Sequence, residues 1–139
     1  MSSRRVPLAV LAAAFAAVTA CSNGTTVAQD RPHNGTGTAS ATAGVQQITI
    51  TTGDDLRFHP STIVVHPGKV RVVLSNTAKV GSGPPHNLQI SGLPGAVPAV
   101  AAGQSAQYEF IAPAPGKYQM VCTFHVSQGQ TGTLVVQKS

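Results

Sequence analysis

The chain has 139 residues, enough for one domain, and is 42% apolar and only 9% charged, with 14 glycines and 10 prolines. This composition is typical of a turn-rich β protein rather than a helical one. The net charge of +5 is modest, and the basic residues are scattered singly. Nucleic acid is therefore excluded as an expected partner.

Residues 1–20 predict a signal peptide. Arg4 and Arg5 form its positive start, and the apolar stretch from residue 8 to 18 is too short to span a bilayer comfortably. The sequence Val18-Thr19-Ala20-Cys21 resembles a bacterial lipobox, in which the cysteine is lipidated and becomes the new N-terminus. The alternative is an ordinary signal peptide cleaved nearby, with Cys21 incidental. The arginine pair leaves both the general secretory and the twin-arginine export routes open.

Residues 21–44 are expected to be a lipidated N-terminus followed by a flexible linker. The stretch is rich in Ser, Thr, Gly, Ala and Asn and has no apolar periodicity. The expected location is therefore the outer face of the bacterial cytoplasmic membrane, where the lipid anchors the chain. If Cys21 carries lipid, Cys122 has no disulfide partner, and a metal is one way to protect a lone thiol in an oxidising compartment.

Residues 45–139 predict one all-β domain. Apolar and polar residues alternate from Val45 to Thr51, which is typical of a half-buried strand. About seven to eight short strands with regular turn signals predict a Greek-key β-sandwich or barrel. The stretch from 93 to 103 is rich in Pro, Ala and Gly and predicts no definite element, although a short helix is one option. The expected strands are 45–51, 62–66, 70–76, 86–90, 105–111, 117–122 and 132–137.

Near the end of the domain, three side chains that can bind a metal lie close together in the sequence. Cys122 ends a predicted strand, His125 follows three residues later, and Gln130 follows five residues after that. His86 lies upstream. One thiolate and two imidazoles form the donor set of a trigonal copper site, whose weak axial ligand can be Met, Gln or a backbone oxygen. The alternative for Cys122 is an inert buried cysteine.

Within the predicted domain, two further histidines lie outside this set. His66 precedes a Pro-Gly turn at the far end of a predicted strand, so we expect it at the surface. His59 lies in a loop beside Pro60, but the trigonal donor set is already complete without it.

Several motifs accompany these donors: Pro85-His86-Asn87, then Pro115-Gly116-x-Tyr118-x-x-x-Cys122-x-x-His125, then Gly132-x-Leu134-x-Val136. With them, the segment from Phe58 to Val136 resembles the cupredoxins, small blue copper proteins of the plastocyanin and pseudoazurin kind. The resemblance implies that His86, Cys122 and His125 are the equatorial ligands of one type 1 copper ion. It also implies that the side chain of Asn87 ties the two ligand loops together.

One position departs from the family pattern. The usual axial Met, five residues after the second ligand His, is Gln130 here, as in phytocyanins of the stellacyanin type. An amide oxygen is a harder donor than a thioether, so it favours Cu(II) over Cu(I). The alternative is that Gln130 faces solvent and the copper has three ligands.

The resemblance implies an electron carrier, not an enzyme, whose redox partners dock on an apolar patch near His125, Pro84 and Pro85. The alternative function is copper delivery or sequestration. Delivery proteins often carry Met-rich or His-rich tracts, whereas this chain has only Met1 and Met120. A copper enzyme needs a second copper site, for which the chain has no spare histidine cluster. A metal-free cupredoxin fold used for protein contacts is disfavoured by the complete ligand set.

Overall fold

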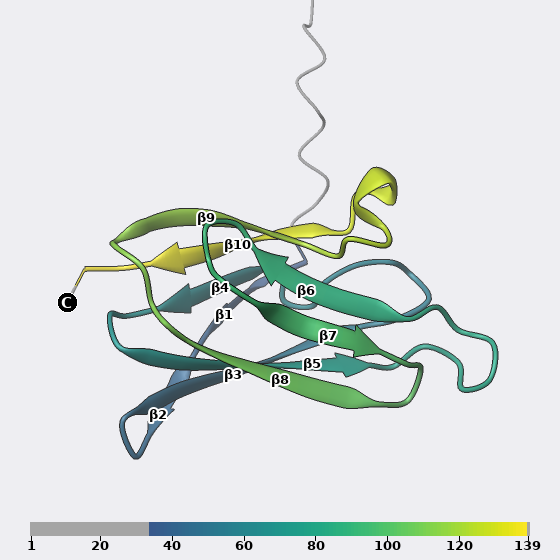
Figure 1. Cartoon of the computed structure of the whole chain (residues 1–139), viewed down its shortest axis with the longest axis horizontal. Coiled ribbons are helices and arrows are strands. Elements are labelled where there is room, and N and C mark those ends of the chain that lie inside the picture. Colours follow the sequence, from purple (N-terminus) through teal and green to yellow (C-terminus); the bar gives the residue numbers. More distant parts are fainter. Residues whose placement is uncertain (1–33, 139) are drawn as a thin grey trace, which may run out of the picture.

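The computed structural model describes residues 34–138, which form two packed β-sheets (Figure 1). The described residues contain ten strands, one 3-10 turn and no α-helix. The strands are β1 (Thr36–Thr38), β2 (Ser40–Thr42), β3 (Val45–Thr52), β4 (Thr62–Val65), β5 (Lys69–Asn76), β6 (His86–Ile90), β7 (Ala96–Val100), β8 (Ser105–Ile111), β9 (Gly116–Val121) and β10 (Thr131–Val136). The 3-10 turn η1 (Val126–Gln128) lies between β9 and β10.

Each sheet combines strands that are neighbours in the sequence with strands that are far apart in it. One sheet has the order β1-β4-β10-β9-β6-β7, and the other has the order β2-β3-β5-β8. β3 pairs with β5 in parallel, and β10 pairs with β4 in parallel and with β9 antiparallel. The predicted all-β Greek-key sandwich is confirmed.

The alternating sequence pattern explains the core. In β5, Val70, Val72 and Leu74 are completely buried, while the residues between them are partly exposed. These side chains meet those of the facing sheet, because successive residues of a strand point to opposite faces. Residues from both sheets, including Ile50, Ile63, Leu88, Met120 and Leu134, fill the interior.

The expected linker up to residue 44 is wrong for residues 36–42. β1 pairs in parallel with β4, and β2 pairs antiparallel with β3. The apolar periodicity did not predict these strands because their side chains are largely exposed, and backbone hydrogen bonds rather than buried side chains hold them at the sheet edges. Among the described residues, the β-sheet domain therefore begins before Val45, and β1 and β2 account for two of the strands beyond the expected number.

The Pro/Ala/Gly-rich stretch from 93 to 103 forms a strand rather than a short helix. β7 pairs antiparallel with β6 and lies at the edge of its sheet. Pro98 is exposed in this strand. An edge strand tolerates proline because one side of its backbone needs no hydrogen-bond partner.

The signal peptide and lipid-anchor predictions fall on residues 1–33, outside the described residues. Within residues 34–138, no helix is long and apolar enough to cross a membrane.

Candidate metal centre

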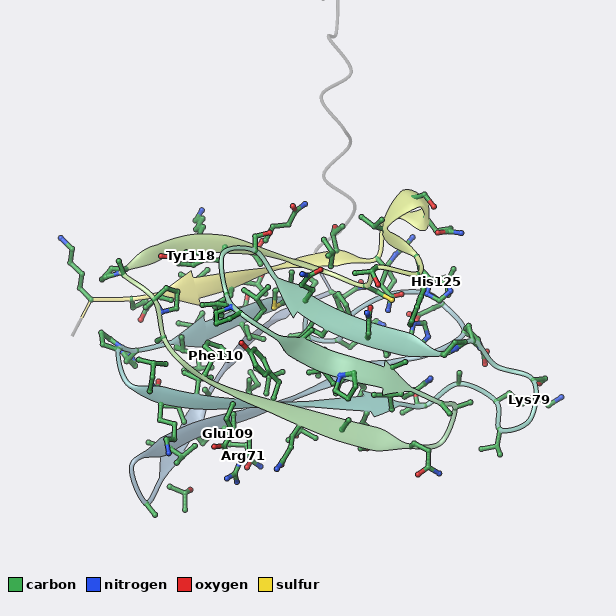
Figure 2. All side chains as sticks on the ribbon, viewed as in Figure 1. Arg71, Lys79, Glu109, Phe110, Tyr118 and His125 are labelled. Carbon is green, nitrogen blue, oxygen red and sulfur yellow. The ribbon has the colours of Figure 1, made fainter. Side chains whose placement is uncertain are left out.

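The four predicted donors meet at one end of the sandwich, opposite the C-terminal end. His125 is labelled there, beside the loop that carries η1 (Figure 2). His86 is the first residue of β6, Cys122 follows β9, and Gln130 precedes β10. These three residues therefore lie at or next to strand ends, where the sheet holds their backbones, whereas His125 lies in the loop directly before η1.

His86 is completely buried, and its ring is oriented by the backbone of a distant loop. Its Nε2 lies 3.0 Å from the carbonyl oxygen of Gly53. Because a carbonyl oxygen can only accept, Nε2 carries the hydrogen and Nδ1 of the neutral ring has a free electron pair. Burial lowers the pKa of His86 and so favours the neutral ring.

Cys122 and His125 belong to one tightly closed loop. The Cys122 thiol is free and fully buried, and its Sγ lies 3.5 Å from His125 Nδ1 and 4.0 Å from His86 Nδ1. The loop closes on itself because the N–H of Cys122 donates to Gln130 O, while the N–H of Gln130 donates to His125 O. Gly129, at φ 81°, supplies the left-handed conformation that turns the chain back toward β10.

Gln130 is also fully buried, so it does not face solvent. Its Oε1 lies 3.0 Å from His86 Nδ1 and 3.1 Å from His125 Nδ1. Its Nε2 donates to Thr52 Oγ1 at 2.6 Å. In this arrangement the bare Nδ1 of His86 and the oxygen of Gln130 face each other with their electron pairs, which a cation between them would stabilise.

The ligand atoms of His86, Cys122 and His125 all lie within 4.8 Å of one another, which makes the three residues a candidate metal site. With the Gln130 oxygen, the donors are two imidazole nitrogens, one sulfur and one amide oxygen. This set fits type 1 copper, which takes two His, one Cys and a weak axial ligand.

Asn87 lies beside the cluster and joins its two halves. Its Nδ2 donates to Thr123 Oγ1, and its Oδ1 accepts from the N–H of Thr123, both at 2.8 Å. Since Asn87 follows His86 and Thr123 follows Cys122, these bonds connect the two ligand-bearing segments directly.

The remaining predicted residues are two histidines outside the donor set and the apolar residues beside His125. His66 is exposed, and His59 Nε2 lies 2.6 Å from Asp55 Oδ2, so neither joins the cluster. Phe124 and Val126, on either side of His125, are 49% and 47% exposed.

Sequence reasoning missed the part played by the end of β3. Thr52 and Gly53 contact Gln130 and His86, although they lie 78 and 33 residues away in the chain. In the sequence alone, both residues simply follow the predicted strand 45–51 and have no assigned role at the site. No local pattern could have found these contacts, because they depend on how the two sheets pack.

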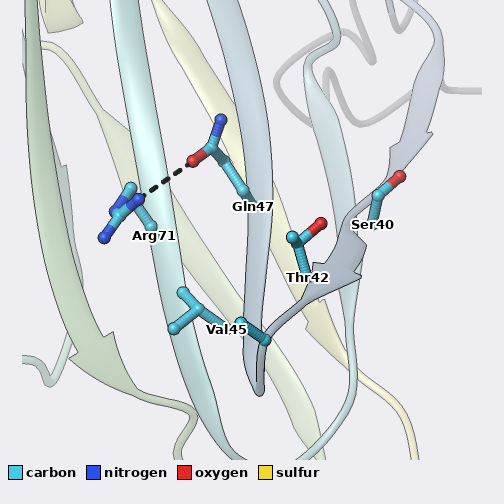
Figure 3. Close-up of a pocket in the computed structure, with 6 residues that line it drawn as sticks. Ser40, Thr42, Val45, Gln47 and Arg71 are labelled. Atoms are coloured by element: carbon cyan, nitrogen blue, oxygen red, sulfur yellow. Dashed lines mark hydrogen bonds between the residues drawn. The ribbon is translucent and has the colours of Figure 1, made fainter.

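A shallow hollow lies away from the donor cluster, on the sheet that contains β2, β3 and β5 (Figure 3). Arg71 lies there with Nη1 3.3 Å from Gln47 Oε1, and its guanidinium also pairs with Glu109 at 2.5–2.6 Å. The charge of Arg71 is therefore already compensated. The hollow is lined by Ser40, Thr42, Ala43, Val45, Gln47 and Arg71.

Solved structures with a similar fold include copper proteins. An auracyanin from Roseiflexus castenholzii aligns with a TM-score of 0.56 at 23% identity, over 65% of this chain and 95% of that one. Auracyanin A, a "blue" copper protein from Chloroflexus aurantiacus, aligns with a TM-score of 0.58 at 22% identity, over 68% and 100% of the two chains. The metal-binding domain of the Cu(I)-exporting P-type ATPase CopA of Streptococcus pneumoniae D39 aligns with a TM-score of 0.57 at 14% identity, over 74% and 96%.

At these identities the structural matches show a shared fold. No curated protein sequence matches the chain. The sequence from residue 9 to 136, however, matches the family of cupredoxin-like domains along most of its length. With a two-sheet sandwich and a His, His and Cys cluster at one end, the chain belongs to the cupredoxin-like domain family.

Proposed function

We propose that this chain is a small type 1 copper protein that carries electrons between redox partners outside the cytoplasmic membrane. The observation that carries the proposal is the convergence of four donor atoms: two imidazole Nδ1 atoms, one thiol sulfur and one amide oxygen. His86, Cys122 and His125 would hold the copper ion as its equatorial ligands, and Gln130 would be the weak axial ligand.

Copper bound to this donor set supplies reversible one-electron chemistry. The chain's own residues favour it by holding the ligands still. Gly53 O fixes the ring of His86, the loop from 122 to 130 closes on itself, and Asn87 ties the two ligand segments together. Rigid ligands limit the geometric change between the two oxidation states, which keeps electron transfer fast.

Copper delivery or sequestration is the alternative, and the likeness to the CopA metal-binding domain favours considering it. Delivery sites use soft thioether donors for Cu(I). Among residues 34–138, Met120 is the one methionine, and it is fully buried in the hydrophobic core, so the described residues hold no methionine-rich tract. An electron carrier should retain copper through many redox cycles, whereas a delivery module should transfer it to a chelating partner within a few.

An enzymatic role would need a second copper site. Within residues 34–138, His86, Cys122 and His125 form the one group of three or more metal-ligating side chains. We therefore propose that the protein is not an enzyme.

Location and partners belong to the same proposal. Lipidation of Cys21 would anchor the chain at the outer face of the membrane, and the residues after it would let the domain reach other proteins. Redox partners would dock around His125, where Phe124 and Val126 are exposed and Pro84 and Pro85 precede the His86 strand.

The test is the visible spectrum of the purified protein after Cu(II) is added. The wild type is expected to show an intense thiolate-to-copper charge-transfer band. Cys122→Ser is expected to abolish it, because a hydroxyl does not replace a thiolate as donor. His66→Ala is a matched control, since His66 is exposed and outside the cluster. A colourless wild-type complex, or a Cys122→Ser variant that keeps the band, would contradict the proposed site.

A further inference from the structure

The last residue of β3, Thr52, contacts the proposed axial ligand from the opposite sheet. It is 1% exposed, and its Oγ1 lies 2.6 Å from Gln130 Nε2. The backbone of Thr52 is itself fixed, because its carbonyl oxygen accepts from both the N–H and the hydroxyl of Thr77, at 2.7 and 3.0 Å. The hydroxyl is thus held in place beside the buried amide.

A side-chain amide can occupy this position in two orientations. In one, Oε1 faces the imidazoles and Nε2 donates to Thr52. In the other, the two atoms exchange places, so that Nε2 faces the bare Nδ1 of His86. Both leave the shape of the core unchanged, and the Thr52 hydroxyl can pair in both, accepting from Nε2 in the first and donating to Oε1 in the second. A cation at the cluster needs the oxygen to point inward.

With the oxygen inward, the amide nitrogen must find an acceptor inside the protein. Gln130 is 0% exposed, so solvent cannot serve, and an unpaired buried N–H carries a desolvation cost. The oxygen of Thr52 is the acceptor in this structure.

We propose that Thr52 is a positioning residue that holds the Gln130 amide with its oxygen toward the metal and thereby strengthens Cu(II) binding relative to Cu(I). The inference rests on the proposed function and deepens it. According to this inference, Thr52, which lies outside the ligand loops, helps to set the reduction potential of the copper.

Thr52→Val tests this directly, because valine has nearly the same shape but no acceptor. The amide of Gln130 would then either leave its nitrogen unpaired or turn it toward His86. Either outcome weakens the axial donor. We expect the affinity for Cu(II) to fall about tenfold. If Cu(I) affinity is unchanged, a tenfold loss corresponds to a rise in potential of about 59 mV.

The experiment compares four proteins by Cu(II) competition against a chelator and by voltammetry at one pH and salt. Thr52→Ser keeps the hydroxyl and is expected to match the wild type. Thr49→Val makes the same change on the same strand, at an exposed position, and is expected to change neither quantity. Urea unfolding of the metal-free proteins separates effects on the metal from loss of stability. If Thr52→Val does not fold, Thr52→Ala takes its place with the same expected direction.

A second background separates positioning from a merely structural role. In Gln130→Leu there is no amide to orient, so Thr52→Val is expected to leave the potential where Gln130→Leu alone puts it. Equal shifts in both backgrounds would overturn the inference, as would a wild-type affinity and potential in Thr52→Val. These results would leave the copper site itself standing. The absence of the charge-transfer band in the wild type would instead overturn the proposed function, and this inference with it.

Discussion

Removing the Asn87 side chain should loosen the connection between the two ligand-bearing segments. Asn87→Ala deletes both hydrogen bonds to Thr123, each 2.8 Å long. These bonds join the residue after His86 to the residue after Cys122, so they bridge segments that are 36 positions apart in the chain. We expect the metal-free domain to lose stability even though neither residue belongs to the buried core.

The expected loss is modest because the two bonds are partly exposed to solvent. A typical intramolecular hydrogen bond contributes about 0.5–1.5 kcal/mol net, so two at the lower part of this range give about 1.5 kcal/mol. For a domain of roughly a hundred residues, that corresponds to a fall of about 7 °C in Tm.

Two further variants should lose less stability than Asn87→Ala, each by an amount that depends on which hydrogen bond it keeps. Thr123→Val removes the hydroxyl but keeps the backbone N–H that donates to Asn87 Oδ1, so it should cost about half as much. Asn87→Asp should cost less than Asn87→Ala, because a carboxylate can accept from both the N–H and the hydroxyl of Thr123.

Urea unfolding of the metal-free proteins measures each change, and a double-mutant cycle gives the coupling between Asn87 and Thr123. We expect a coupling of about 0.5–1 kcal/mol for the bond between the side chains. The reasoning is refuted if Asn87→Ala unfolds at the wild-type midpoint, or if the two substitutions are simply additive.

Three other substitutions test separate features. Gln130→Met should raise the Cu(II)/Cu(I) potential by on the order of 100 mV, since a softer thioether replaces an oxygen that favours Cu(II). Voltammetry measures this change, and a lowered potential would mean that the donor argument has the wrong sign. Cys21→Ala should leave the protein unlipidated, so that it stays unprocessed or leaves the membrane fraction, and a wild-type N-terminus without acyl groups at Cys21 would contradict the lipoprotein prediction. Gly132→Ala should destabilise the domain by about 1–3 kcal/mol in urea, because its Cβ would clash with the carbonyl oxygen of Ser61, whereas Gly116→Ala, with no atom closer than 3.7 Å, should cost much less.

Much of the sandwich could be predicted because its strands carry a local signal. The period of two in Val45–Thr52 and in Lys69–Asn76 requires one face to be buried, whatever the partner strand is. Three strands at sheet edges lack this signal. β1, β2 and β7 are held by backbone pairing with a neighbour rather than by an alternating buried face, so their Ser, Thr, Ala and Pro-rich sequences did not predict them.

The donors divide in the same way. Cys122, His125 and Gln130 lie within nine residues of one another, and the short loop between two paired strands keeps them together. Their spacing in the sequence was therefore enough to predict that they lie close in space. His86 is 36 residues from Cys122, and only its motif and the family resemblance tied it to the others before the structure brought Nδ1 and Sγ to 4.0 Å.

The sequence by itself determined the residue types of the candidate site, the strand boundaries at His86 and Cys122, and the replacement of the usual axial Met by Gln. Only the tertiary structure decided how those side chains are aimed. The hydrogen bonds from His86 to Gly53 and from Gln130 to Thr52 form where one sheet packs on the other. Such contacts leave no periodic trace in the sequence, because a single hydroxyl or carbonyl at the right place is enough, and its place depends on the packing of the whole core.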